Sequence, residues 1–322
     1  LALVNSRKST AATMAVAARE TRRIRLATGV AVPTTRIAPV IAHSIATIAE
    51  LAPGRVELGV GNGNTARLTM GLKPVPLGRM KREIRLIRAL LAGEIAEHEF
   101  EGETHPVQLL HRDHRFINLA DKIPITLSAF GPKTLAYCGE ECDAHLTWAA
   151  SPEMLSEARK QIGAAAAKVG RDVNAIPSKG IYPLAVLRPG ETSSSPRVLN
   201  SLAPFITNFL HVQVEWDDTL LPPTPALAEV INRYREHVAS IAPEHRHLLL
   251  HEGHLVYARE DEREFLRADL AEAVAMVAEP DDMIERIRAL EAAGLKHFAF
   301  QVTDDPVGQM RHFADQVIRR YH

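Results

Sequence analysis

The chain has 322 residues, which is long enough for one large α/β barrel or two smaller domains. Of these residues, 46% are hydrophobic and 24% are charged, a composition typical of soluble globular proteins. Its 38 basic and 39 acidic residues nearly cancel. This charge balance gives no overall field that favours nucleic acid or anionic lipid as a partner.

The sequence shows no targeting signal, which predicts a cytoplasmic protein, and it contains two cysteines. No apolar run approaches the roughly 20 residues that span a bilayer, and the N-terminus lacks a signal-peptide pattern. The two cysteines, Cys138 and Cys142, are four residues apart and share one face of an expected helix. Two thiols alone do not complete a structural zinc site, so we expect helix packing or exposure rather than a chemical role.

Helices and short apolar strands alternate through the first half of the chain. Apolar periodicity with Pro, Gly and Ser at the expected ends predicts each element. The helices are predicted at 11–23, 38–54, 77–94, 132–142 and 151–170, and the strands at 24–32, 55–61, 123–130, 144–148 and 180–187.

The alternation is interrupted between residues 188 and 280. We expect helices over 198–213, 227–241 and 263–279, a proline-rich turn over 217–226 and an extended segment over 247–258. A helix over 280–294 and a strand over 297–302 then resume the alternation. We interpret 188–280 as an insertion before the last strand, of the kind that shapes a substrate pocket.

Strict alternation of strands and helices predicts parallel strands joined by right-handed crossovers. Six strands are visible, whereas a TIM (β/α)8 barrel has eight. If the sheet closes as a barrel, two strands are expected before residue 1, and the chain then begins in a loop leading to a helix. We therefore predict one barrel domain over 1–322 whose first two strands are absent.

The most glycine-rich stretch, "RVELGVGNGN" at 55–64, runs from a strand into a loop. A dinucleotide-binding loop has the spacing G-x-G-x-x-G after the first strand, with an acidic residue on the next strand. Here Gly59, Gly61 and Gly63 follow the second visible strand with the spacing G-x-G-x-G. Two alternatives stay open, a tight turn that needs positive φ and a close approach of the backbone to a flat ligand.

Two further strand ends carry glycine. In "SAFGPKTLA" at 128–136, Gly131 precedes Pro132 at a helix start, where free amides and the helix dipole attract an anion and Lys133 adds a cation. An ordinary strand-to-helix turn is the alternative. In "ATGVAVPTTR" at 27–36, Gly29 interrupts a branched apolar strand, which favours a bulge or a close ligand approach.

These three stretches, in this order, resemble the bacterial luciferase-like family of flavin- and deazaflavin-dependent oxidoreductases. The resemblance covers residues 10–150 almost continuously and resumes in "HLLLHEGHLVY" and "IERIRALEAAGLKHFAFQ". It implies a TIM-like barrel, and a strained cis peptide at Gly29–Val30 that backs a flavin-type ring, at a cost of about 3 to 4 kcal/mol. It also implies a homodimer.

The resemblance implies coenzyme F420, a 5-deazaflavin, as the cofactor, because Gly131–Pro132–Lys133 is similar to the phosphate loop of that branch. FMN is the alternative, since family members that hold FMN tend to have Ser and Thr hydroxyls there. The residues implied in cofactor binding are Gly29, Val30, Ala31, Gly61, Asn62, Gly63, Arg67, Ser128, Ala129, Phe130, Gly131, Pro132, Lys133 and Thr134.

Asn64 and Trp148 are the candidate catalytic residues. The family's sugar-phosphate dehydrogenases have a glutamate at the position of Asn64, and an amide cannot act as a general acid, so the resemblance leaves that substrate class in doubt. Methylene-tetrahydromethanopterin reductases are the other relatives that the resemblance suggests. Trp148 ends a strand, where a barrel presents its active residues, although buried packing is an alternative.

Four histidines, His245, His247, His251 and His254, lie within ten residues, but their spacing does not match H-E-x-x-H. We therefore expect no metal. The overall prediction is an F420-dependent oxidoreductase that transfers a hydride to or from a small organic substrate. The alternatives are an FMN-dependent monooxygenase and a non-catalytic flavin-binding protein.

Overall fold

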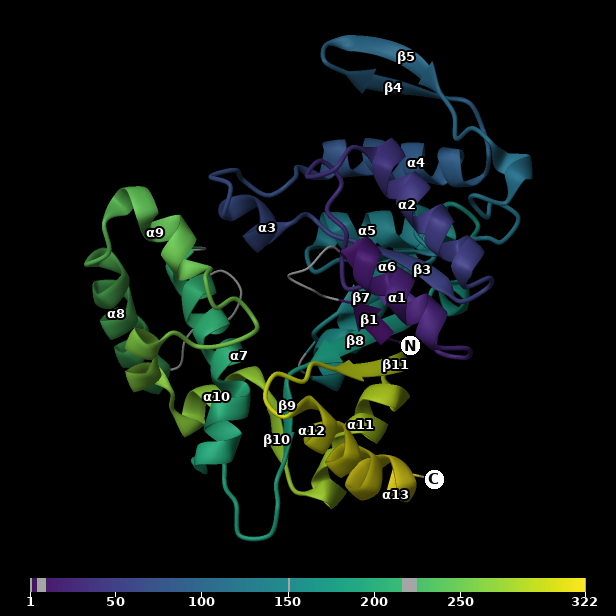
Figure 1. Ribbon diagram of the computed structural model, residues 1–322. Helices are drawn as coiled ribbons and strands as arrows, with labels where there is room; N and C mark the ends of the chain where they lie inside the picture. Colours follow the sequence, from purple (N-terminus) through teal and green to yellow (C-terminus); the bar gives the residue numbers. More distant parts are fainter. Residues whose placement is uncertain (1, 5–9, 150, 216–224, 322) are drawn as a thin grey trace. The chain divides into compact units, whose positions relative to one another are not determined.

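The computed structural model describes residues 2–4, 10–149, 151–215 and 225–321 (Figure 1). Contacts between residues divide the chain into two compact units. The first unit is Leu1–Thr147 with Ser156–Lys179, and the second is Trp148–Leu155 with Gly180–His322. Each unit has its own hydrophobic core.

The first unit is built on a parallel sheet. Its strands lie in the order β1 (Ala2–Val4), β2 (Leu26–Thr28), β3 (Val56–Val60), β6 (Ile125–Ser128) and β7 (Ala144–Thr147), followed by the first residues of β8 (Ser178–Tyr182). Because side chains alternate along a strand, each strand presents one face to the helices and the other to the opposite side of the sheet.

Helices cover one face of this sheet. They are α1 (Thr10–Glu20), α2 (Ala38–Leu51), α4 (Leu77–Leu91), α5 (Pro132–Glu141) and most of α6 (Pro152–Lys168), and the short α3 (Asn64–Leu68) follows β3. Leu26, Leu58 and Leu127 from the strands form one buried cluster with α2 residues such as Ile45. Parallel strands packed against helices read as apolar runs, which is why the sequence pattern located them.

An antiparallel hairpin, β4 (Ala96–Phe100) and β5 (Glu103–Val107), follows α4. Figure 1 shows it extending past α4. Most of its residues are exposed, and the sequence pattern gave no prediction for it.

The second unit contains a smaller parallel pair, β9 (Leu184–Val186) and β10 (Met276–Ala278). The end of β8 lies beside β11 (Leu295–Phe300). Helices α11 (Pro280–Ala292), α12 (Pro306–Phe313) and α13 (Arg319–Tyr321) with the π-helical turn Ala314–Ile318 complete this part. Buried apolar residues of β9, β10 and α11 form its core.

The region predicted as an insertion is helical. It consists of α7 (Pro196–Glu215), α8 (Pro225–Ala239), α9 (Pro243–Leu250), a 3-10 helix at Glu260–Phe265 and α10 (Ala268–Val274). These helices share a separate apolar cluster that includes Leu202, Tyr234 and Leu270. Most of the predicted proline-rich turn at 217–226 lies outside the described residues.

Three predictions of local structure are wrong. Residues 247–258 are not extended, because Pro243 and Glu244 begin a helix that reaches Leu250 and turns follow it. The predicted helix over 263–279 ends at Val274, because pairing with β9 draws Met276–Ala278 into a strand despite the alanine-rich sequence. Residues 2–4 form β1, although the sequence suggested a loop there.

Candidate functional site

Three of the predicted site segments lie at one edge of the sheet in the first unit. Ala31 forms a parallel bridge with Val60, and Val60 is opposite Leu127 in the register between β3 and β6. Gly61, the residue after Val60, and Ser128, the residue after Leu127, therefore lie at the carboxyl ends of two adjacent strands. In parallel α/β proteins this edge is where ligands bind.

The alternating glycines let β3 and its loop approach the segment after β2 closely. A Cβ on Gly59 would lie 2.3 Å from the carbonyl oxygen of Thr28, and one on Gly63 would lie 2.3 Å from Cγ1 of Val32. Between them, a Cβ on Gly61 would lie 3.2 Å from a methyl group of Val30. The G-x-G-x-G spacing therefore has the period of a strand, and it matches every second residue of the neighbouring segment.

Backbone hydrogen bonds fix this approach. The Ala31 amide and the Thr28 hydroxyl both donate to the carbonyl oxygen of Gly59, at 2.7 Å each, and the Gly61 amide donates to Ala31. Gly63 also has φ of 73°, so the tight-turn interpretation holds for this glycine. The Val30 side chain stays 36% exposed at this edge.

The peptide bond between Gly29 and Val30 is trans, as are all peptide bonds of the described residues, so the cis bond implied by the resemblance is absent. The hydrogen bonds of Ala31 hold the bulge beside β3 with the ordinary trans geometry, which avoids the cost of a cis bond.

The polar residues on either side of Gly63 differ in their contacts. Asn64 begins α3, and its side-chain carbonyl oxygen Oδ1 is buried without a hydrogen-bond partner in the described part of the chain. Asn62 is exposed. Arg67 donates to the Thr34 hydroxyl at 2.8 Å and to the carbonyl oxygen of Lys73, so its guanidinium braces two loops.

The turn after β6 presents an open helix start. Gly131 is the N-cap of α5, no side chain in the described ranges caps this end, and the first turn contains no acidic residue. Thr134 donates its amide and its hydroxyl to the Gly131 carbonyl oxygen, at 3.0 and 2.8 Å. Phe130 and Lys133 are exposed. This end of α5 can therefore accept an anion from solvent.

His145, which sequence reasoning missed, supports this turn. It lies fully buried in β7, where Nε2 is 3.0 Å from the carbonyl oxygen of Ala129 and Nδ1 is 3.2 Å from the Ser178 hydroxyl. Burial lowers the pKa of His145 to about 4. The imidazole is therefore neutral at pH 7, and it donates one hydrogen bond to the residue before Phe130. A single histidine in an otherwise apolar strand was the available signal.

The pKa of His145 predicts a loss of stability in mild acid. The unfolded chain takes up a proton on this side chain near pH 6.5, whereas the folded chain does so only near pH 4. The free energy of unfolding keeps this contribution above pH 6.5 and loses about 3 kcal/mol as the pH falls from 6.5 towards 4. Chemical denaturation between pH 7.5 and 4.5 measures this slope.

In the same experiment, His145→Gln should flatten the pH dependence, whereas His43→Gln, at an exposed position of α2, should leave the slope unchanged. Equal slopes for the wild type and His145→Gln would show that His145 does not cause the acid sensitivity.

A buried ion pair lies on the face of this sheet that is opposite the helices. Lys179 in β8 bonds to Oε2 of Glu57 in β3 and lies 3.2 Å from the hydroxyl of Thr126 in β6. The second oxygen of Glu57, Oε1, is 2.5 Å from a guanidinium nitrogen of Arg25, although that contact is not an aligned hydrogen bond. Each of these strand residues is second in its strand, so the cluster lies near the amino ends, away from the candidate site.

Trp148 and the four clustered histidines belong to the second unit. Trp148 directly follows β7 and is 36% exposed. His251 is buried and its Nε2 lies 2.7 Å from a carboxylate oxygen of Glu215. Within the described ranges, no three His, Cys, Asp or Glu side chains converge as a metal site requires.

Cys138 and Cys142 are both fully buried at α5, as packing rather than exposure requires. In the described residues, no helix is both long and apolar enough to cross a membrane.

The chain is similar in sequence to known proteins over part of its length. The chain is 38% identical over 162 residues to a 5,10-methylenetetrahydromethanopterin reductase of Methanolobus tindarius, covering 50% of this chain and 48% of that protein. It is 36% identical over 145 residues to an F420-dependent glucose-6-phosphate dehydrogenase of Nakamurella multipartita, covering 41% and 39%. The chain thus spans half or less of the length of the curated relatives it matches.

Solved structures match over nearly the whole chain. The coenzyme F420 dependent tetrahydromethanopterin reductase of Methanopyrus kandleri gives a TM-score of 0.64 at 19% identity, covering 97% of this chain and 87% of that one. An F420-dependent secondary alcohol dehydrogenase gives a TM-score of 0.62 at 18% identity, covering 96% and 83%. These likenesses confirm the predicted fold class, an α/β fold of the TIM-barrel type.

The family model for luciferase-like monooxygenases matches residues 3–297. The match includes the glycine loop, the turn into α5 and the helical region between β9 and β10. The chain therefore belongs to the luciferase-like monooxygenase family.

Proposed function

We propose that this protein is an oxidoreductase that binds coenzyme F420 and transfers a hydride between its deazaflavin ring and a small organic substrate. The observation that carries the proposal is the uncapped start of α5 at Gly131–Lys133, beside the glycine-lined edge of β3. The two relatives described above are F420-dependent or act on methylene-tetrahydromethanopterin by name, which supports the same cofactor.

The described residues fit such a cofactor. At the start of α5, the backbone amide and the side chain of Lys133 would hold its phosphate group, together with the Thr134 hydroxyl once that hydroxyl turns away from the Gly131 carbonyl oxygen. Apart from Gly131 and its two chain neighbours, no atom of the described residues lies within 4 Å of the position that a Cβ on Gly131 would take, so an anion can approach the backbone there. The exposed face of Val30, backed by Gly61, would support the ring. When bound, coenzyme F420 supplies a ring carbon that accepts or gives a hydride.

The role of the α5 start can be tested by Lys133→Gln. Removing this cation should weaken coenzyme F420 binding about fivefold, because a charge at a helix N-terminus contributes roughly 1 kcal/mol. Fluorescence titration measures the dissociation constant. Lys168→Gln, at the exposed end of α6, is the matched control and should bind as the wild type does; equal affinities of Lys133→Gln and the wild type would place the phosphate elsewhere.

Asn64 and Trp148 remain the proposed substrate-facing residues. Among the described residues, the side-chain oxygen Oδ1 of Asn64 is buried without a hydrogen-bond partner, so a substrate or ring group that donates a hydrogen bond would satisfy it. Asparagine can orient such a group but cannot supply a proton. The proton must come from another group or from water.

Substrate-dependent oxidation or reduction of coenzyme F420 distinguishes an enzyme from a protein that only stores this cofactor. Reduced coenzyme F420 is mixed with protein, and the return of its fluorescence is followed after addition of a methylene-bridged pterin or a ketone; oxidised coenzyme is tested with secondary alcohols and glucose 6-phosphate. We expect one of these classes, other than the sugar phosphate, to change the redox state of the cofactor. Tight binding without turnover by any class would favour the non-catalytic flavin-binding protein.

The oligomeric state and the cellular location are also proposals. The family resemblance implies a homodimer, and a cytoplasmic location is the matching proposal. Light scattering of the purified protein measures the mass, and a value near twice 35.4 kDa is expected.

A further inference from the structure

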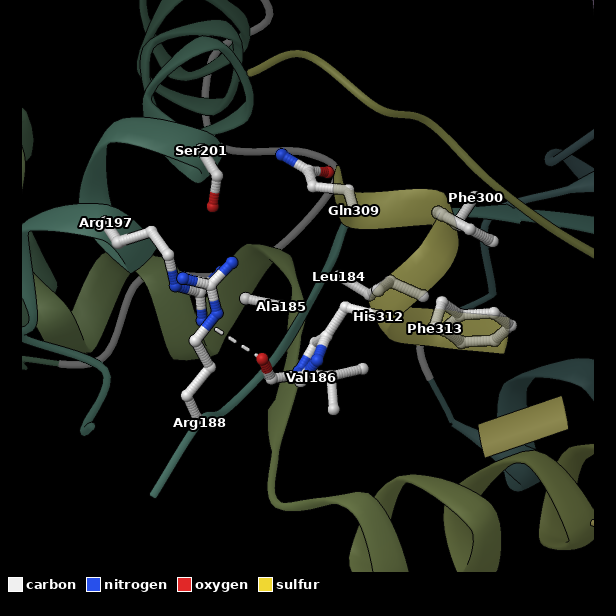
Figure 2. A pocket seen from close by; sticks show the side chains of 10 residues that line it. All are labelled: Leu184, Ala185, Val186, Arg188, Arg197, Ser201, Phe300, Gln309, His312 and Phe313. Carbon is white, nitrogen blue, oxygen red and sulfur yellow. Dashed lines mark hydrogen bonds between the residues drawn. The ribbon is translucent and has the colours of Figure 1, made fainter. Parts of the chain in front are cut away.

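The second unit contains a small cavity that the proposed cofactor site does not use. It is bounded by β9, the start of α7, the end of β11 and α12, and its volume is about 20 Å³ (Figure 2). A volume of this size holds about one water molecule or one oxygen atom. Arg188, Arg197 and His312 line it together with the aromatic residues Phe300 and Phe313.

Positive charge exceeds negative charge around the cavity. Arg197 pairs with Glu191 and also donates to the carbonyl oxygen of Val186 at 3.0 Å. Arg188 follows β9, and its guanidinium forms no salt bridge within the described residues, while its backbone amide donates to Glu191 at 2.8 Å. One carboxylate therefore faces two guanidinium groups, and only Arg197 is neutralised by a direct contact.

His312 adds an unused polar atom. Its Nε2 is buried without a hydrogen-bond partner in the described part of the chain, and the ring also bonds to the backbone of Val186. Burial, and then repulsion from Arg188 and Arg197, lower the pKa of His312. A buried donor or acceptor without a partner is costly, so this atom of His312 indicates a missing ligand atom, whereas the exposed guanidinium of Arg188 is hydrated and is available to an incoming anion.

We propose that this cavity anchors one terminal anionic oxygen, of a carboxylate or a phosphate group, on a larger ligand. Arg188 supplies the charge and the hydrogen-bond donors. The rings of Phe300 and Phe313, with centroids 4.4 Å apart, form an apolar wall for the adjoining part of the ligand. The site accepts a single oxygen rather than a whole sugar or ring, because the cavity is no larger.

Binding should be coupled to proton uptake by His312. The charged groups around the ring are Arg188, Arg197 and Glu191. An anion offsets the repulsion from the two arginines, so the protonated ring becomes favourable and Nε2 donates to the ligand oxygen. Anion binding should therefore be tighter at pH 6 than at pH 8.

The test is calorimetric titration of the full chain, without coenzyme, using inorganic phosphate and acetate at constant ionic strength. We expect saturable binding of at least one of them, about tenfold weaker in Arg188→Gln. Arg286→Gln, which removes an exposed charge on α11 in the same unit, is the control and should bind as the wild type does. The two anions distinguish a phosphate from a carboxylate ligand.

Binding that does not saturate in the wild type, or an Arg188→Gln variant with unchanged affinity, would overturn this proposal. His312→Gln gives a second check, since it should remove the difference between pH 6 and pH 8. None of these measurements uses coenzyme F420, so their failure would leave the proposed function standing, and failure of cofactor binding would leave the anion site standing.

Discussion

Lys179→Met is expected to lower the free energy of unfolding by about 3 kcal/mol, the cost of leaving a buried carboxylate without its main partner. Glu57 is 1% exposed and Lys179 is 3% exposed. Arg25, whose side chain is 48% exposed, would remain as a weaker partner. Urea denaturation at pH 7 measures the change.

The double variant Glu57→Leu with Lys179→Met is the informative control. It removes both charges, so its stability should return to within about 1 kcal/mol of the wild type. If the double variant were as unstable as Lys179→Met, lost packing rather than an unpaired charge would explain the effect.

The second large effect concerns Gly59. Gly59→Ala should destabilise the protein by about 3 kcal/mol, because a methyl group 2.3 Å from the Thr28 carbonyl oxygen forces the backbones of β2 and β3 apart. The same movement stretches the hydrogen bonds that Ala31 and Thr28 donate to Gly59. Thermal unfolding followed by circular dichroism would report the loss.

Gly78→Ala in α4 provides the matched comparison, since among the described residues nothing beyond its chain neighbours and the local helix backbone lies within 4 Å of the added Cβ. That variant should be neutral or slightly more stable, because alanine is the better helix former. A neutral result for Gly59→Ala would contradict the close approach of the two backbones.

Most of the first unit could be predicted from the sequence, because its elements carry strong local signals. In α4, Met80, Ile84 and Ile87 repeat at helical spacing and are all buried. The strands are mostly apolar, and Pro132 and Pro152 mark the helix starts. Such signals act within a few residues and need no knowledge of the rest of the chain.

The remainder depends on contacts between distant residues. The spacing of Gly59, Gly61 and Gly63 is explained by Thr28, Val30 and Val32, which a single sequence does not place beside them. Glu57 and Lys179 are 122 residues apart. In the same way, β10 becomes a strand through its pairing with β9, against its local helix propensity.

The candidate site shows both situations. The anion-accepting start of α5 was predictable, because Gly-Pro after a strand is a local pattern. The support from His145 was not, because it depends on the fold bringing β7 beside the turn after β6. The charge around the cavity near His312 likewise combines residues from β9, α7 and α12.

Competition between the two cofactors shows directly whether this member of the family uses coenzyme F420. Purified protein is titrated with coenzyme F420 and with FMN, separately and then together, while the fluorescence of each is followed. We expect saturable binding of coenzyme F420 that excess FMN displaces poorly. Tight binding of FMN with no binding of coenzyme F420 would contradict it and would favour an FMN-dependent monooxygenase.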